Sequence, residues 1–295
     1  MRPTPFGSVL TAMLTPFDVN GEVNYEAAWE LARYLVDTGT EGIVVCGTTG
    51  ESPTLSDLEK IALFKTVLES VGDKAYVIAG TGTYDTAHSA SMSRKAADLG
   101  CHALMAVTPY YSKPPQAGLV AHFSVIADAT DLPVLLYNIP GRTARLIEIP
   151  TLKELADHPN IVAVKDAVDD LEFTKTELVT LPDDFGVYAG SDAFTYDIVS
   201  MGGSGVVSVA AHLVGNQISK MIEAIRSDDG ATAERLHLAM MPLFEALFLE
   251  PNPMPLKAAL GRVWKEVGRP RLPLLPADDS VTRQVLQALG EAQLA

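Results

Sequence analysis

Short apolar segments alternate with longer amphipathic segments along most of this chain of 295 residues. Eight of the short segments are almost continuously apolar, which is typical of parallel strands that are covered on both faces. These predicted strands are Val9–Phe17, Gly42–Gly47, Tyr76–Gly80, Ala103–Val107, Pro133–Asn138, Ile161–Ala167, Gly186–Gly190 and Gly205–Ala210. Because parallel strands need a crossover connection between them, this alternation limits the fold more than any other feature of the sequence.

The segments between the predicted strands carry apolar residues at helical spacing. In Asn24–Thr38 these residues form one stripe behind an N-cap at Asn24, and Ser56 with Glu59 forms a capping box at the start of Ser56–Val71. The other predicted crossover helices are Asp85–Leu99, Gln116–Ala129, Pro150–His158, Asp170–Thr180, Asp192–Met201 and Leu213–Ser227.

Eight consecutive strand–helix units predict an α/β fold of the (β/α)8 TIM barrel class with a C-terminal helical appendage. We expect residues 1–227 to form the barrel and residues 228–295 to pack on it as a helical region. Three helices are predicted there, over Ala231–Leu249, Pro255–Val267 and Ser280–Gln293. A doubly wound sheet is the alternative, but no glycine-rich nucleotide loop follows the first predicted strand.

The charge balance narrows the class of partner. The chain has 37 Asp and Glu against 22 Lys and Arg, and its formal net charge is −15. This argues against nucleic acid and anionic membranes as partners, because binding to polyphosphates requires a basic surface. There is no signal-peptide pattern, no apolar run of about 18 residues and no metal or redox motif around Cys46 and Cys101. We therefore expect a cytoplasmic protein.

Lys165 stands out because it ends the apolar run of the sixth predicted strand. Active sites of this fold lie at the carboxyl ends of the strands. Burial there would lower the pKa of the lysine from about 10.4, and the neutral amine would attack a carbonyl group to form a Schiff base. Position alone leaves a structural alternative open, in which Lys165 pairs with Asp166 or extends into solvent.

Other polar residues end neighbouring predicted strands. Thr48 and Thr49 offer hydroxyls and closely spaced backbone N–H groups for a small carboxylate. Tyr137 offers a phenol for acid–base work, and Arg142 offers a cation for a second carboxylate. Taken singly, each is explained equally well by a turn, a half-buried aromatic ring or a surface arginine.

Neither a metal nor a cofactor is expected. The six histidines form no closely spaced pair of the kind that binds a metal. Gly80–Tyr84 lacks the third glycine of a dinucleotide loop. Gly202–Gly205 precedes the eighth predicted strand, which places it at the opposite end of the barrel from the predicted site.

Taken together, the motifs resemble the dihydrodipicolinate synthase / N-acetylneuraminate lyase family of class I aldolases. The resemblance covers essentially the whole chain, and four motifs carry it in barrel order. They are Gly47–Glu51, Pro109–Tyr111, Tyr137–Thr143 and Val164–Ala167.

The resemblance implies a set of catalytic residues. Lys165 is the residue that forms the Schiff base with pyruvate. Thr49 hydrogen-bonds Tyr137, which transfers protons, and Tyr111 completes the relay from a neighbouring subunit. Thr48 and Thr49 hold the carboxylate of pyruvate. The resemblance thus implies that the chain self-associates, as a homotetramer built from two dimers.

Arg142 indicates the synthase branch of the family, in which an arginine here binds the carboxylate of L-aspartate 4-semialdehyde. The implied reaction condenses that aldehyde with pyruvate in diaminopimelate and lysine biosynthesis. Gly190 and Val207 are further implied substrate-binding positions, and Ser191 departs from the Gly-Asp-Asp of some relatives. Two alternatives remain. One is a lyase that cleaves a 2-keto-3-deoxy sugar acid or N-acetylneuraminate through the same Lys165 imine, and the other is a catalytically silent binding protein.

The sequence also departs from the family at the regulatory site of lysine-inhibited relatives, where His and Glu side chains at a subunit interface hold lysine. The matching positions here are Asp57, Lys60, Tyr84 and His88. His88 replaces the acidic residue that receives the ammonium group of the ligand, and Lys60 repels it. The resemblance therefore implies weak or absent feedback inhibition by L-lysine. Tyr110 is either part of this interface or part of the chemistry.

Overall fold

The computed structural model describes residues 1–293 and contains a closed barrel of eight parallel strands in sequential order. The strands are β1 (Val9–Ala12), β2 (Gly42–Val45), β3 (Tyr76–Gly80), β4 (Ala103–Val107), β5 (Val134–Asn138), β6 (Ile161–Asp166), β7 (Gly186–Ala189) and β8 (Gly205–Ser208). Pairing of β1 with β8 closes the barrel, with Leu10 opposite Val207. The predicted (β/α)8 fold is confirmed.

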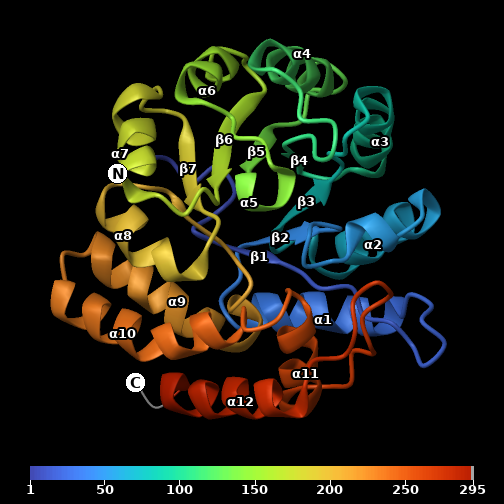
Figure 1. Cartoon of the computed structure of the whole chain (residues 1–295), viewed down its shortest axis with the longest axis vertical. Coiled ribbons are helices and arrows are strands. Elements are labelled where there is room, and N and C mark those ends of the chain that lie inside the picture. The colour runs from blue at the N-terminus through green and yellow to red at the C-terminus, as the bar shows by residue number, and fades with distance from the viewer. Residues whose placement is uncertain (294–295) are drawn as a thin grey trace.

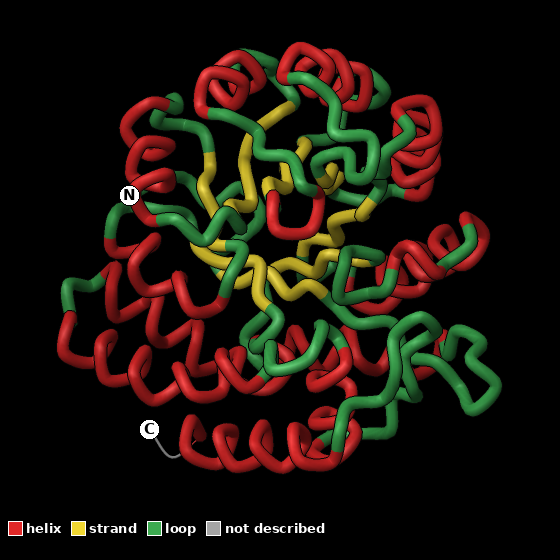
Figure 2. Tube along the Cα trace, viewed as in Figure 1, coloured by secondary structure: helices red, strands yellow, loops and turns green. Residues whose placement is uncertain are grey.

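Helices surround the barrel, as Figures 1 and 2 show. The crossover helices are α1 (Tyr25–Asp37), α2 (Asp57–Val71), α3 (Thr86–Leu99), α4 (Gln116–Ala127), α6 (Ile149–Ala156), α7 (Leu171–Thr180), α8 (Thr195–Ser200) and α9 (Ala211–Arg226). The predicted caps are present, because the Asn24 side chain accepts a hydrogen bond from the Ala27 N–H and Ser56 forms its capping box with Glu59. These caps satisfy backbone donors that the first helical turn leaves free.

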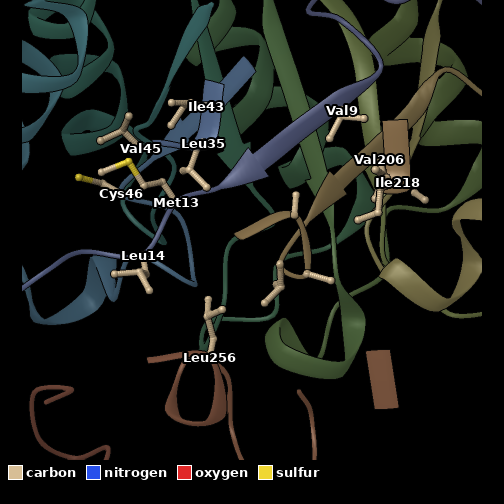
Figure 3. Close-up of a cluster of buried hydrophobic side chains, with 14 of the residues drawn as sticks. Val9, Met13, Leu14, Leu35, Ile43, Val45, Cys46, Val206, Ile218 and Leu256 are labelled. Carbon is tan, nitrogen blue, oxygen red and sulfur yellow. The ribbon is translucent and has the colours of Figure 1, made fainter. Parts of the chain in front are cut away.

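The core has two layers. Side chains between the strands and the outer helices form the larger cluster; Figure 3 shows part of it, with Val9 and Val206 of the barrel beside Ile218 of α9. A second cluster fills the inside of the barrel. At its amino-terminal end the Tyr188 ring stacks on Phe6 with centroids 6.4 Å apart. The barrel is therefore packed below its mouth, and any substrate must bind at the carboxyl ends of the strands.

Three more helices follow the barrel: α10 (Gly230–Ala246), α11 (Met254–Val263) and α12 (Asp279–Gln293). α10 packs against α9 and α12, and α11 packs against α12 (Figure 1). The predicted helical appendage is thus present in the described residues. Across those residues, no helix combines the length and the apolar character needed to cross a membrane.

Some predicted boundaries are wrong. β1 ends at Ala12 instead of Phe17, because the Leu14 N–H donates to His212 of α9 and the Phe17 N–H donates to the Val267 carbonyl. α11 ends at Val263 instead of Val267, because Trp264 leaves the helical conformation, with φ −126° and ψ −85°. The chain then passes close to Phe17, where a Cβ at Gly268 would lie 2.1 Å from the Phe17 carbonyl oxygen.

The structure contains three short helical turns that the sequence patterns did not predict as separate elements. They are α5 (Pro140–Thr143) and the 3-10 turns η1 (Ser52–Thr54) and η2 (Asp192–Phe194). Each follows the carboxyl end of a strand. They therefore lie at the end of the barrel where the candidate site is expected.

Candidate active site

A cavity of about 750 Å³ opens at the carboxyl ends of the strands. Most of the predicted site residues line this cavity, together with part of the segment between α10 and α11. Its lining includes Thr48, Thr49, Tyr137, Arg142, Lys165, Gly190, Ser191, Val209, Phe244, Phe248, Leu249 and Asn252. A smaller cavity of about 250 Å³ adjoins it and shares Thr48, Tyr137 and Arg142.

Lys165 lies on β6 with only 4 % of its surface exposed, and it lines the larger cavity. Its Nζ atom is 4.1 Å from the centroid of the Tyr137 ring. The register of β5 and β6 pairs these two residues, and paired residues of adjacent strands share one side of a sheet. Within residues 1–293, no carboxylate forms an ion pair with Lys165.

Asp166 does not pair with Lys165, so one structural alternative from the sequence is wrong. Its carboxylate accepts hydrogen bonds from the Val168 N–H at 2.9 Å and from the Thr174 hydroxyl at 2.5 Å. Successive residues of a strand point to opposite faces, so Asp166 faces the helices while Lys165 faces the barrel. Lys165 is buried, which also excludes extension into solvent.

Asp192 is a buried carboxylate near Lys165 to which the sequence assigned no role. It accepts hydrogen bonds from the Val209 and Ala210 N–H groups at 3.0 Å each, and from the Ser208 hydroxyl. Burial raises the pKa of Asp192, while these hydrogen bonds and the charge of Lys165 act in the opposite direction. Asp192 thus fixes the loop after β8, and Val209 of that loop lines the cavity.

The loop with Thr48 and Thr49 follows β2 and lies between two residues with left-handed backbones, Cys46 at φ 58° and Glu51 at φ 56°. The Thr49 hydroxyl accepts a hydrogen bond of 2.9 Å from the Asn252 side chain. The bond from Thr49 to Tyr137 that the resemblance implies is not formed, although the Thr49 hydroxyl that accepts from Asn252 still has its own proton to donate. Thr48 is the threonine that lines both cavities together with Tyr137.

The two tyrosines of the β4–α4 loop lie differently. Tyr111 is 92 % exposed and has a left-handed backbone at φ 70°. Tyr110 lines the smaller cavity, and its ring meets the Tyr84 ring edge-on at 5.3 Å. A single chain therefore brings Tyr110, and not Tyr111, to the cavities beside Tyr137.

The three other predicted substrate-binding residues differ in position. Arg142 lies on α5, is exposed and lines both cavities. Gly190 lines the larger cavity, where a Cβ would lie 2.5 Å from that of Ala167, so only glycine fits. Val207 is fully buried inside the barrel. The residue here that lines the cavity is Val209, in the loop that follows β8.

Sequence reasoning missed Asn252 as a site residue. It is 6 % exposed, lines the larger cavity and holds the Thr49 hydroxyl. The only sequence sign was that the resemblance to the family extends to residues 250–257, which indicates no role for Asn252.

The site thus combines a buried amine, which has no carboxylate partner in the described part of the chain, with a phenol, two threonines and an exposed guanidinium. This set suits covalent chemistry on the carbonyl group of an anionic substrate. Among residues 1–293, no group of three or more His, Cys, Asp or Glu side chains is arranged to hold a metal ion.

Comparison with known proteins agrees with this arrangement. The model of the Dihydrodipicolinate synthetase family matches residues 5–292. A protein of Desulforudis audaxviator named 4-hydroxy-tetrahydrodipicolinate synthase is 50% identical over 289 residues, which cover 98% of each chain. The lysine-bound structure of the dihydrodipicolinate synthase from Cyanidioschyzon merolae is 45% identical, with a TM-score of 0.96 over 99% of this chain and 100% of that one.

A further solved structure that is similar to this chain is that of a monomeric dihydrodipicolinate synthase variant, which is 36% identical and has a TM-score of 0.95. The match covers 99% of this chain and 98% of that one. By family model, sequence identity and fold, this chain belongs to the dihydrodipicolinate synthetase family.

Proposed function

We propose that this protein is a 4-hydroxy-tetrahydrodipicolinate synthase, which condenses pyruvate with L-aspartate 4-semialdehyde in diaminopimelate and lysine biosynthesis. Relatives with about half of their residues identical over nearly the whole chain carry this name. The observation that carries the proposal is the buried Lys165 amine, which lines the cavity beside Tyr137 and has no carboxylate partner among residues 1–293.

In the proposed reaction, the neutral Lys165 amine attacks C2 of pyruvate, and loss of water gives an imine. Loss of a C3 proton converts the imine into an enamine, whose C3 attacks the aldehyde carbon. The amino group of the semialdehyde then attacks C2, closes the ring and releases Lys165 as the free amine. The phenol of Tyr137 transfers protons between these steps.

The remaining residues have binding and relay roles in this proposal. Thr48 and Thr49 hold the carboxylate of pyruvate through hydroxyl and backbone groups, with Thr49 also in the proton relay. Arg142 binds the carboxylate of the semialdehyde, for which its exposed position on both cavities is suited. The backbone at Gly190 contributes to the wall that surrounds the bound substrate, and the main chain at Val207, inside the barrel, meets the surroundings of Lys165.

We also propose that the protein works in the cytoplasm as a homotetramer, a dimer of dimers, in which Tyr111 reaches the site of a neighbouring subunit. The exposure of Tyr111 supports this, since a single chain leaves its ring in solvent. Light scattering gives the mass, and Tyr111→Phe should lower kcat without changing that mass. A monomer with full activity would contradict this assembly.

The chain divides, in this proposal, into the catalytic barrel of residues 1–227 and the helical region of residues 228–295, the last two of which lie outside the described residues. Arg142 favours the synthase over a lyase of the same family. Assays of condensation with the semialdehyde, and of cleavage of a 2-keto-3-deoxy sugar acid and of N-acetylneuraminate, separate the two. Cleavage faster than condensation would overturn the proposal.

A further inference from the structure

A buried ion pair joins the C-terminal helical region to the loop that carries Thr48 and Thr49. Lys257 Nζ, on α11, lies 2.6 Å from Glu51 Oε1 at the end of that loop, and each side chain is 2% exposed. Within residues 1–293, neither atom makes a hydrogen bond to another group. Removing one member of such a pair leaves an uncompensated buried charge.

The second oxygen of Glu51 is held by the same region of the chain. The backbone N–H of Arg271 donates to Glu51 Oε2 at 2.8 Å. The Arg271 side chain donates to the Thr54 carbonyl at 2.8 Å, just beyond the loop. Lys257 Nζ and the Arg271 guanidinium also lie over the Phe17 ring, at 4.1 and 4.5 Å from its centroid. Both carboxylate oxygens of Glu51 thus contact residues that follow the barrel.

The backbone of Glu51 needs such support. Its φ of 56° is left-handed, a conformation that residues other than glycine adopt only when their surroundings hold them in it. The neighbouring Gly50 carbonyl accepts a hydrogen bond of 2.7 Å from Thr15, and Asn252 donates to Thr49 at 2.9 Å. The shape of this loop is therefore set by long-range contacts as well as by its own sequence.

We propose that Lys257, acting through Glu51, is a positioning residue that holds the Thr48–Thr49 loop in the geometry that receives the carboxylate of pyruvate. Lys257 itself does not line the larger cavity, so it acts only through the loop. The inference rests on the proposed role of Thr48 and Thr49. A merely structural ion pair would stabilise the fold and leave pyruvate binding unchanged.

The test compares pyruvate binding with stability in the full-length protein. Borohydride trapping at a series of pyruvate concentrations gives the half-saturating concentration, and thermal unfolding gives the Tm. The variants are Lys257→Met, Glu51→Gln and the double variant, in which neither member of the pair is left charged.

Two controls separate positioning from stability. Arg2→Met removes a buried guanidinium at the other end of the barrel, where it donates to the carbonyls of Phe185 and Leu178 at 2.7 Å each. It should lower the Tm without changing the half-saturating concentration. Lys265→Met breaks the exposed pair with Glu30 at 2.8 Å and should change neither quantity.

We expect each single variant to lower the Tm and to raise the half-saturating pyruvate concentration about tenfold, because small misplacements of binding groups are costly. The double variant should regain much of the Tm while its half-saturating concentration stays raised. An unchanged half-saturating concentration in all three variants, or its full return in the double variant, would overturn the inference. If the wild-type protein traps no pyruvate, the proposed function fails instead.

Discussion

The Nζ atom of Lys165 lies 4.1 Å from the centre of the Tyr137 ring, because the register of β5 and β6 places the two residues side by side. Both are about 4 % exposed. The backbone ladder between these two strands therefore sets the distance between the proposed nucleophile and the proposed proton donor, without a loop. A site on neighbouring strands is held more precisely than one on loops.

Tyr137→Phe should separate binding from proton transfer. The variant keeps the aromatic ring beside Lys165 and loses only the hydroxyl. We expect kcat to fall by about 10²- to 10³-fold, because acid–base catalysis contributes effects of that size. Borohydride trapping should still modify Lys165 at a similar pyruvate concentration. A kcat within a few-fold of the wild-type value would contradict the proposed role of Tyr137.

Arg142→Met should act on the second substrate. The guanidinium lines both cavities, and its loss removes a charge-assisted contact to a carboxylate. We expect the KM for the semialdehyde to rise about tenfold or more, with a smaller change for pyruvate. Arg145→Met is the matched control, since Arg145 follows three residues later and lines neither cavity. Equal effects of the two variants would count against the assignment.

L-Lysine should inhibit weakly or not at all. Asp57 is the carboxylate among the residues that match the lysine site of inhibited relatives. Its oxygens already lie 2.9 and 3.1 Å from His88 Nε2. Lys60 is buried nearby and would repel the ammonium of the ligand. Initial rates at increasing L-lysine concentration give the inhibition constant, and His88→Glu should increase the sensitivity. Half-inhibition of the wild-type enzyme at micromolar L-lysine would show that this expectation is wrong.

Acid should remove the stabilising effect of Glu59. Hydrogen bonds from Arg271, at 2.5 and 3.2 Å, are the largest cause that lowers the pKa of Glu59 from 4.5 to about 2. As the pH falls, Glu59 is therefore protonated in the unfolded chain before it is protonated in the folded protein. The stabilisation is complete above pH 4.5 and is lost as the pH falls toward 2.

Urea unfolding measures this effect. The difference in unfolding free energy between the wild type and Glu59→Gln should shrink as the pH is lowered from about 6 to about 3. Glu69→Gln is the control, since Glu69 pairs with Lys65 only at the surface, at 3.7 Å. A difference that is constant over this pH range would refute the assigned cause.

Local sequence patterns were enough to predict the barrel and the end of the barrel at which the candidate site lies. Continuously apolar segments indicated parallel strands that are covered on both faces. A lysine at the carboxyl end of one of these strands was therefore expected to lie at the open end of the barrel. The Ser56–Glu59 capping box could also be predicted from the sequence, because it depends on residues only three positions apart.

Contacts between distant segments could not be predicted in this way. Asn252 and Thr49 are 203 residues apart in the sequence, and no local pattern indicates that they hydrogen-bond. The ion pair of Lys257 with Glu51 depends in the same way on how α11 packs against the barrel. The long-range contacts also explain why β1 and α11 end earlier than their apolar patterns suggest.

Schiff-base formation on Lys165 is tested by borohydride reduction in the presence of pyruvate, followed by peptide mass spectrometry. Lys257 is an internal comparison, because burial lowers its pKa to about 8 but Glu51 pairs with it outside the cavity. The proposed reaction predicts a reduced pyruvate adduct on Lys165 alone, and no adduct or activity in Lys165→Ala. An unmodified Lys165, an adduct on Lys257 instead, or full activity of Lys165→Ala would contradict it.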